Sequence, residues 1–141
     1  MKADEQAELA SRIQLKRVYE ASSGADGVCF LVERLWPRGI KKSSLKIEAW
    51  LKDVAPSVGL RQWFNHEPAL WNEFRKRYFA ELEENQSSWL PILEAASCST
   101  VTLIYSSHDP EHNNAVALKE FLNKRLHQKT KSKLAPDPAQ P

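Results

Sequence analysis

Three runs of apolar residues along the chain predict three β-strands. Residues 13–19 alternate between apolar and polar positions, residues 28–35 are apolar on both faces until Glu33, and residues 100–105 are β-branched and apolar. Alternation with a period of two is typical of a strand covered on one face, whereas a continuous apolar run is typical of a strand covered on both. Because only a short turn-like segment links the first two strands, we expect them to pair antiparallel.

Apolar residues at steps of three and four predict helices between the second and third strands. They indicate a short helix over residues 47–54, a helix capped by Ser57, a long helix that begins at Pro68, and an amphipathic helix around residues 89–93. After the third strand, Asp109 and the proline behind it supply a cap and a first-turn residue for a last helix. This order of elements predicts an α/β fold, a small mixed sheet of about three strands covered by helices.

The length of 141 residues favours a single domain with a sizeable core. We expect residues 1–12 to form a flexible N-terminus, residues 13–126 the α/β domain, and residues 127–141 a disordered, basic and proline-rich tail. Residues 124–141 hold five basic side chains and one acidic side chain, whereas residues 13–123 hold 13 basic and 14 acidic ones. A near-neutral body argues against a nucleic-acid-binding face on the fold.

The composition also excludes several classes of protein. No apolar run approaches the ~20 residues of a membrane span, and nothing resembles a signal peptide, so we expect a cytoplasmic protein without a membrane partner. Cys29 and Cys98 lack redox or metal-ligand spacing and are expected to be buried thiols in a reducing compartment. His108 and His112 would not share one face of the last helix, and four glycines leave no glycine-rich phosphate loop. We therefore expect no metal and no cofactor.

The clearest functional pattern lies where the second apolar run stops. The proline at position 37 ends the strand, so Arg34 and Arg38 flank that end at the rim of the sheet, where open α/β proteins bind ligands. An arginine in a buried run needs a carboxylate or a bound anion, because an unpaired buried charge costs several kcal/mol. Trp36 lies at the strand end rather than on a helical apolar face, which makes it a candidate for stacking on a ligand.

A second polar group follows the third strand. Asp109, His112, Asn113 and Asn114 open the last helix, where unpaired N–H groups and the helix dipole favour an anion. Each has a structural alternative, since Asp109 can serve only as a helix cap and the asparagines can face water. His66, in the break between two helices, can transfer a proton near neutral pH or only bond a backbone carbonyl. We regard His66 and Asp109 as the candidate catalytic residues.

Two further residues complete the predicted ligand site. Ser57 can orient His66 in addition to capping its helix. Arg75 lies within the apolar stripe of the long helix, so its guanidinium either extends to the surface or pairs inward. We expect Arg75 to be mostly buried and to pair with Glu33, the obvious candidate, or with another inward-facing carboxylate.

Five motifs together resemble the YeaO-like family, a branch of a bacterial superfamily of unknown function. They are KRVY at 16–19, LVERLWPRG at 31–39, WLKDVAPS at 50–57, LRQWFNH at 60–66 and DPEHNNA at 109–115. The likeness covers roughly residues 13–126 and implies a small α/β protein without assigning an activity. The family usually has aspartate where this chain has Glu33. Other branches have cysteines near the last strand and helix, where this chain has Tyr105 and Asn113, so the resemblance implies no thiol chemistry.

Three functions are consistent with these residues. The first is binding of, or action on, a small anionic, phosphorylated ligand, held by Arg34 and Arg38 with the asparagines as donors and His66 as proton carrier. The second is association with nucleic acid through Trp36, the arginines and the basic tail. The third is a noncatalytic interaction module in which the polar residues only build structure. The sequence does not predict the oligomeric state.

Overall fold

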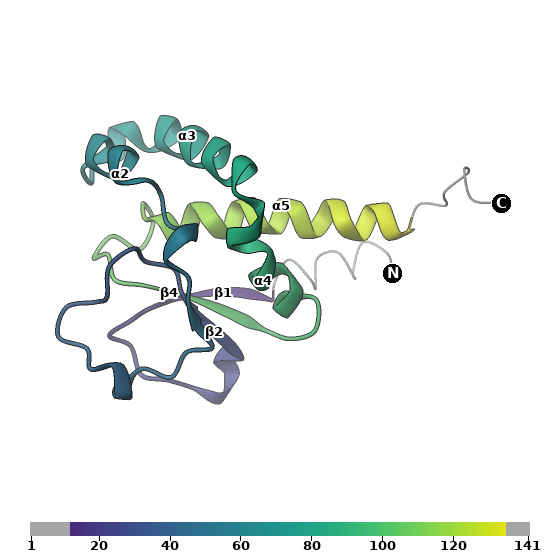
Figure 1. The fold of residues 1–141 in the computed structure, drawn as a ribbon, viewed down its shortest axis with the longest axis horizontal. Coiled ribbons are helices and arrows are strands. Elements are labelled where there is room, and N and C mark those ends of the chain that lie inside the picture. Colours follow the sequence, from purple (N-terminus) through teal and green to yellow (C-terminus); the bar gives the residue numbers. More distant parts are fainter. Residues whose placement is uncertain (1–11, 135–141) are drawn as a thin grey trace.

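The structure is a computed structural model that describes residues 12–134. Its centre is one four-stranded sheet in the order β1-β4-β2-β3, with every neighbouring pair parallel (Figure 1). The strands are β1 (Ile13–Arg17), β2 (Val28–Leu31), β3 (Ala49–Trp50) and β4 (Val101–Tyr105). Because all four strands are parallel, their carboxyl ends meet at the same edge of the sheet.

The described part of the chain has three α-helices between β3 and β4 and a fourth after β4. They are α2 (Val58–Phe64), α3 (Trp71–Glu84), α4 (Gln86–Ala96) and α5 (Asn114–Leu134). Four 3-10 turns complete the elements: η1 (Gly24–Asp26), η2 (Lys42–Ser44), η3 (Lys52–Val54) and η4 (Pro68–Leu70). The helices gather on one side of the sheet, and α5 runs as one long rod along it (Figure 1).

The strand β4 is central in the sheet, since it pairs with β1 on one edge and with β2 on the other, and both of its faces are covered. All five of its residues are buried, and their side chains alternate between two apolar clusters. Leu103 packs in the main core beneath the helices, whereas Ile104 packs with Leu31 on the opposite face. That second face is covered by apolar side chains of the segment around residues 36–50, including Trp36 and Trp50, rather than by a helix. The continuous apolar run of β4 follows from this double burial.

The α/β class is confirmed, but the expected sheet is wrong in two respects. The sheet has four strands rather than about three, and it is parallel rather than mixed. β1 and β2 do not pair with each other, because β4 lies between them and takes the backbone hydrogen bonds of both. The link of residues 18–27 returns to the start of β2, and Lys16 anchors it through Ala21 O at 2.8 Å and the Asp26 carboxylate at 2.8 Å.

Several element boundaries also differ from the predictions. β2 ends at Leu31, five residues before Trp36, and residues 47–54 form β3 and η3 instead of a helix. Trp50 lies in β3, where it pairs with Leu31, so its apolar spacing reflects packing on the second sheet face. The helix that Ser57 caps and the long helix that follows Pro68 are confirmed.

The expected pair of Arg75 and Glu33 is wrong. Arg75 instead pairs with Glu120 of α5, with Nε donating to Oε2 at 2.9 Å. The Arg75 side chain is 28% exposed and that of Glu120 is 32% exposed, so solvent screens the pair. Such a pair contributes at most about 1 kcal/mol, far less than the removal of a fully buried partner would cost. Arg75 therefore joins α3 to α5 and lies away from the sheet edge.

The two ends of the chain are only partly described. The expected flexible segment 1–12 and the end of the expected tail, residues 135–141, lie outside the described residues, apart from Arg12. Within the range 127–141 the helix α5 continues to Leu134. In the described part of the chain, no helix has the length and apolar character needed to cross a bilayer.

Candidate functional site

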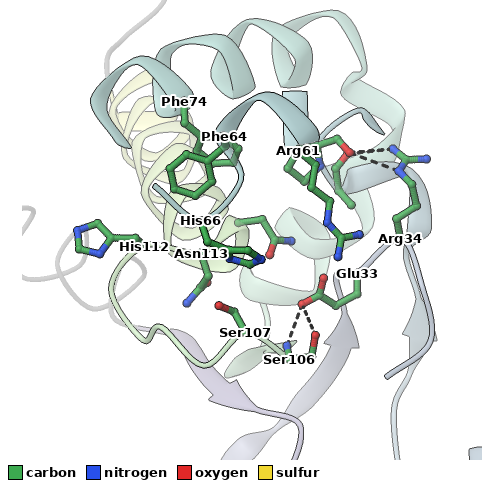
Figure 2. A pocket seen from close by; sticks show the side chains of 13 residues that line it. Glu33, Arg34, Arg61, Phe64, His66, Phe74, Ser106, Ser107, His112 and Asn113 are labelled. Carbon is green, nitrogen blue, oxygen red and sulfur yellow. Dashed lines mark hydrogen bonds between the residues drawn. The ribbon is translucent and has the colours of Figure 1, made fainter. Parts of the chain in front are cut away.

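The carboxyl edge of the sheet contains a cavity between the strand ends and the helices (Figure 2). It encloses about 90 Å³, or about 630 Å³ when the open solvent at its mouth is included, so it accommodates one small group while the rest of a ligand would lie outside it. Residues from five chain segments line it: Glu33 and Arg34 after β2, Ala55 and Pro56 after η3, Arg61, Phe64 and His66 from α2 and its end, Phe74 from α3, and Ser106, Ser107, His112, Asn113 and Asn114 around the start of α5.

Glu33 is the carboxylate of this cavity. Its Oε1 accepts hydrogen bonds from the Ser106 backbone N–H at 2.8 Å and from Ser106 Oγ at 3.2 Å, which ties the end of β2 to the end of β4. Burial raises the pKa of Glu33, and the two hydrogen bonds from Ser106 only partly offset that effect. Oε2 accepts no hydrogen bond from the described groups and keeps some solvent contact, so it is available to a ligand.

Arg34 and Arg61 approach the cavity from different sides. Arg34 Nε donates to Pro56 O at 3.3 Å and its Nη2 donates to Ala55 O at 3.3 Å, so this guanidinium turns toward the backbone after η3 (Figure 2). The guanidinium of Arg61 points toward Glu33 (Figure 2). Among the described side chains, no carboxylate lies within 4.0 Å of either guanidinium. Arg61 therefore has no salt-bridge partner within 4.0 Å among the described residues, although its positive charge acts on Glu33 and opposes the rise in the pKa of that carboxyl.

His66 lies in a backbone conformation that non-glycine residues seldom adopt. Asn65 and His66 have φ values of 46° and 56°, and Asn65 closes α2 in the left-handed region. Consecutive left-handed residues are strained, and strain of this kind is concentrated at functional sites. The strained turn brings the exposed His66 ring over the cavity (Figure 2).

The segment before α5 is held by its own side chains. Asp109 accepts hydrogen bonds from the backbone N–H groups of Glu111 at 2.9 Å and His112 at 3.1 Å, and its Oδ2 lies 3.0 Å from His112 Nδ1. These hydrogen bonds, led by that from Glu111, lower the pKa of Asp109. Asp109 thus caps a turn rather than α5. The cap of α5 is Asn113, whose Oδ1 accepts from Val116 N at 3.0 Å.

Asn114 also has a structural role. Its Nδ2 donates to Val32 O at 2.7 Å, which joins the start of α5 to the residue just after β2. Asn113 is buried, and its Nδ2 donates to Asp109 O at 2.8 Å. Both asparagines line the cavity, but their amide nitrogens already serve as donors within the protein. They shape the cavity wall.

A more open groove adjoins the cavity. Its lining includes Arg17 and Tyr19 at the end of β1, Leu35, Trp36, Pro37 and Arg38 after β2, and His108, and it shares Glu33, Arg61 and Ser106 with the cavity. Arg17 is fixed there, because its Nε donates to Ser107 O at 3.0 Å and its Nη2 lies 3.0 Å from His108 Nδ1. Trp36 packs edge-on against Trp50, with ring centroids 5.2 Å apart.

The structure brings together most of the predicted site residues, but in two adjoining hollows. Arg34, His66, His112, Asn113 and Asn114 line the cavity, and Trp36 and Arg38 line the groove. Ser57 does not orient His66, because its Oγ donates to Glu81 Oε2 at 2.5 Å. Asp109 holds His112, and Arg75 is bound to Glu120.

Sequence reasoning missed Arg61, Ser106, Ser107 and Arg17 as site residues. Arg61 lies next to the buried face of α2, since it is one residue after Leu60 and three before Phe64. A helical wheel could have placed it at the border of that face. The serines follow the most buried strand directly, which is where parallel sheets present ligand-binding groups.

No metal centre is indicated in the described part of the chain. No group of three or more histidine, cysteine or carboxylate side chains is placed there to hold an ion. The closest arrangement is the pair of Asp109 and His112, which supplies two groups and already has a role in the turn.

We expect Glu33→Gln to stabilise the protein at neutral pH by about 1 kcal/mol. The raised pKa means that ionising Glu33 costs more in the folded state than in the unfolded state. The free energies of unfolding of wild type and variant should therefore match below pH 4.5, the ordinary pKa of a glutamate, and diverge as the pH rises through the folded pKa. Thermal unfolding across pH measures the difference.

Asp109→Asn should change stability in the opposite direction to Glu33→Gln, because the pKa of Asp109 is lowered rather than raised. The lowered pKa of Asp109 means that its ionised form stabilises the fold above pH 3.8, and this contribution is lost as the pH falls through the folded value. Asp109→Asn should destabilise the protein at neutral pH and match wild type in acid. A Glu33→Gln variant that melts lower than wild type at pH 7 would contradict the prediction for Glu33.

Comparison with known proteins gives consistent matches along nearly the whole chain. A family model described as "Inactive DUF488-N3 subclade" matches residues 12–140. The uncharacterized protein YeaO of Escherichia coli (strain K12) is 39% identical over 110 residues, which are 78% of this chain and 96% of that protein. The uncharacterized protein Rv3073c of Mycobacterium tuberculosis (strain ATCC 25618 / H37Rv) is 36% identical over 115 residues, 82% of this chain and 97% of that protein. No solved structure gives a significant match.

Proposed function

This chain belongs to the family described as the inactive DUF488-N3 subclade, and we propose that it binds a small anionic ligand at the carboxyl edge of its sheet without catalysing a reaction. The predicted resemblance to the YeaO-like family is confirmed by the 39% identity to YeaO. The word "inactive" in the family description supports binding rather than catalysis. A cytoplasmic location is part of the proposal, and the two free cysteines are consistent with it. The expectation that both are buried is wrong: Cys29 is only partly buried, and Cys98 is exposed because it lies in the turn after α4.

The charge balance of the two hollows is the observation that supports this function. Four arginines line the cavity and the groove: Arg17, Arg34, Arg38 and Arg61. Glu33 is the one carboxylate among the residues found to line them. Without these five residues, residues 13–123 hold nine basic and 13 acidic side chains, so the positive charge is concentrated here. Arginine clusters bind carboxylates and phosphates through paired, charge-assisted hydrogen bonds.

The hydrogen bonds argue against a catalytic site. Among the described residues, no histidine is bonded to a serine hydroxyl or a cysteine thiol, so no activated nucleophile is formed. His66 has no hydrogen-bonded carboxylate to orient it, because Asp109 holds His112. Binding needs only the arginines and the shaped cavity, and both are present without rearrangement.

Proton transfer by His66 is a second candidate function. The observation in its favour is the strained backbone of His66, with φ at 56°, because proteins retain such strain mainly where it serves a function. In this proposal Asp109 could orient the His66 ring only if its carboxylate left His112 and formed a hydrogen bond with His66 instead. Chemical change of a bound ligand that His66→Ala abolishes, with binding retained, would favour this candidate over binding alone.

Titration with inorganic phosphate tests the proposed function. We expect calorimetry to detect saturable binding to the wild-type protein, and Arg61→Ala to weaken it by about tenfold or more, the equivalent of one or two charge-assisted hydrogen bonds. Arg77→Ala is the matched control, because Arg77 is an exposed arginine of α3 that pairs with Glu73 and lines neither hollow.

The same titration can contradict the proposal. Equal affinities of wild type and Arg61→Ala would place the anion elsewhere. Absence of any heat of binding with phosphate and with ribose 5-phosphate would remove the support for an anion site. Arg61→Ala should melt like wild type, because Arg61 is exposed, its side chain makes no hydrogen bond within the described residues, and its backbone hydrogen bonds to Ser57 and Asn65 are kept in the variant.

A further inference from the structure

The cavity and the groove form one continuous bipartite site, although they differ in chemistry. Glu33, Arg61 and Ser106 line both hollows, so a single ligand can pass from one into the other beside these residues. The groove is the larger and more open part, at about 970 Å³ counted with its open solvent. Together they are larger than a free phosphate requires.

The cavity has the features of a site for a flat ring. Phe64 and Phe74 are almost fully buried and form its apolar wall, with ring centroids 4.4 Å apart and planes inclined by 30°. Pro56 and Ala55 extend this apolar lining. Because Phe64 and Phe74 are 7% and 2% exposed and pack on each other, a planar group would contact only the part of their rings that faces the cavity, in the tilted or edge-on arrangement that aromatic pairs favour.

Glu33 adds a polar requirement to that ring. Its Oε1 is engaged by Ser106, whereas Oε2 has no hydrogen-bond donor among the described residues. Oε2 keeps some solvent contact in the free protein, but a ligand that covers it has to replace that contact with an N–H donor, because a carboxylate oxygen buried without a partner costs about 1–3 kcal/mol or more. A hydrocarbon ring would leave that oxygen unpaired, so a ring with N–H donors is favoured.

The groove supplies the complementary charge. Arg38 is exposed on its rim, and Arg17 is held by the carbonyl groups after β4. Trp36 and Tyr19 form its aromatic side, and Arg17 lies over the Tyr19 ring at 4.7 Å from the centroid. Arg61 stands between this positive groove and the ring cavity, within reach of an anionic group joined to the ring.

We propose that the ligand is a nucleotide, with its base in the cavity of Phe64, Phe74 and Glu33 and its phosphate in the groove of Arg17, Arg38 and Arg61. This inference rests on the proposed anion-binding function and names its ligand class. A nucleoside monophosphate joins a planar ring with N–H groups to a phosphate, as the two hollows require.

Calorimetry with matched compounds tests the inference. The probes are the four ribonucleoside monophosphates, ribose 5-phosphate and inorganic phosphate. We expect at least one nucleotide to bind about tenfold or more tightly than ribose 5-phosphate, because the base adds burial and one hydrogen bond. Glu33→Gln should weaken binding of that nucleotide relative to ribose 5-phosphate, whose own affinity should not fall because the variant removes a negative charge from the groove, whereas Arg38→Ala should weaken both. Arg77→Ala should change neither.

Each outcome separates this inference from the proposed function. If ribose 5-phosphate binds as tightly as every nucleotide, or if Glu33→Gln weakens both equally, the base does not occupy the cavity and only anion binding stands. If phosphate and ribose 5-phosphate fail to bind while a nucleoside without phosphate binds, the anion-binding function is contradicted, and so is the placement of a phosphate in the groove. Much tighter binding of a ribonucleotide hexamer, with a steep salt dependence, would overturn a free nucleotide in favour of a nucleic-acid strand.

Discussion

Gly27→Ala should destabilise the protein by about 3 kcal/mol or more, the largest effect that we expect from any single methyl group. Gly27 has φ at +65°, and a Cβ at this position would lie 2.1 Å from the backbone oxygen of Thr100. That oxygen accepts the hydrogen bond from Val28 N at 2.9 Å, which opens the pairing of β2 with β4. The methyl group would therefore force the two central strands apart.

Two other glycines distinguish the two causes of the expected loss of stability, which are backbone strain and steric overlap. Gly39 also has a positive φ, at +80°, but a Cβ there meets no atom within 4 Å, so Gly39→Ala should cost only the backbone strain of about 1 kcal/mol. Gly24 has neither problem, and Gly24→Ala should change stability by about 0.5 kcal/mol at most. Denaturant midpoints of the three variants test this order. A Gly27→Ala variant as stable as Gly39→Ala would show that the strands adjust without cost.

The sequence correctly predicted those elements that residues close together in the chain specify. The apolar run that became β4, the cap at Ser57 and the start of the long helix after Pro68 all depend on neighbours in the chain. A hydrogen-bonded cap and a fixed proline φ act over a few residues, so the sequence near them is sufficient.

The order of the strands depends on contacts that no local pattern contains. β4 enters the sheet between β1 and β2 from about 70 residues further along the chain, and the pairing of β2 with β3 involves only two residue pairs. The spacing of Trp50 and its neighbours matches a helix, but packing on the second sheet face decides the structure. Tertiary context overrides propensity in such short segments.

The sequence named His66 as a site residue, but it predicted neither the left-handed backbone there nor the place of Glu33 in the cavity. Asn65 and His66 adopt left-handed backbone, and Glu33 retains a carboxylate whose pKa burial raises. Both features cost stability, and proteins keep such costs chiefly where function needs them. β2 and β4 are parallel, as is usual for strands joined by a long helical crossover, and this brings the ends of both strands to one edge. That arrangement places Glu33 beside Ser106.

Phe74→Ala should destabilise the protein by about 3–5 kcal/mol, because it removes a buried ring from the junction of the core and the cavity. Phe74 is 2% exposed and lies 4.4 Å from Phe64, 5.5 Å from Trp71 and 5.8 Å from Tyr78 between ring centroids. The space that it leaves would join the cavity, so the apolar wall proposed to hold the base would be lost. Chemical denaturation measures the first effect and nucleotide titration the second.

Phe79→Ala is the control on the same helix. Phe79 is half-buried, packs against Phe121 at 5.8 Å between ring centroids, and lines neither the cavity nor the groove. It should cost less stability than Phe74→Ala and leave nucleotide affinity unchanged. If Phe74→Ala does not fold, Phe74→Leu retains apolar volume without the flat ring, and we expect it to weaken nucleotide binding more than ribose 5-phosphate binding. Equal nucleotide affinity in wild type and Phe74→Leu would mean that the aromatic wall does not contact the base.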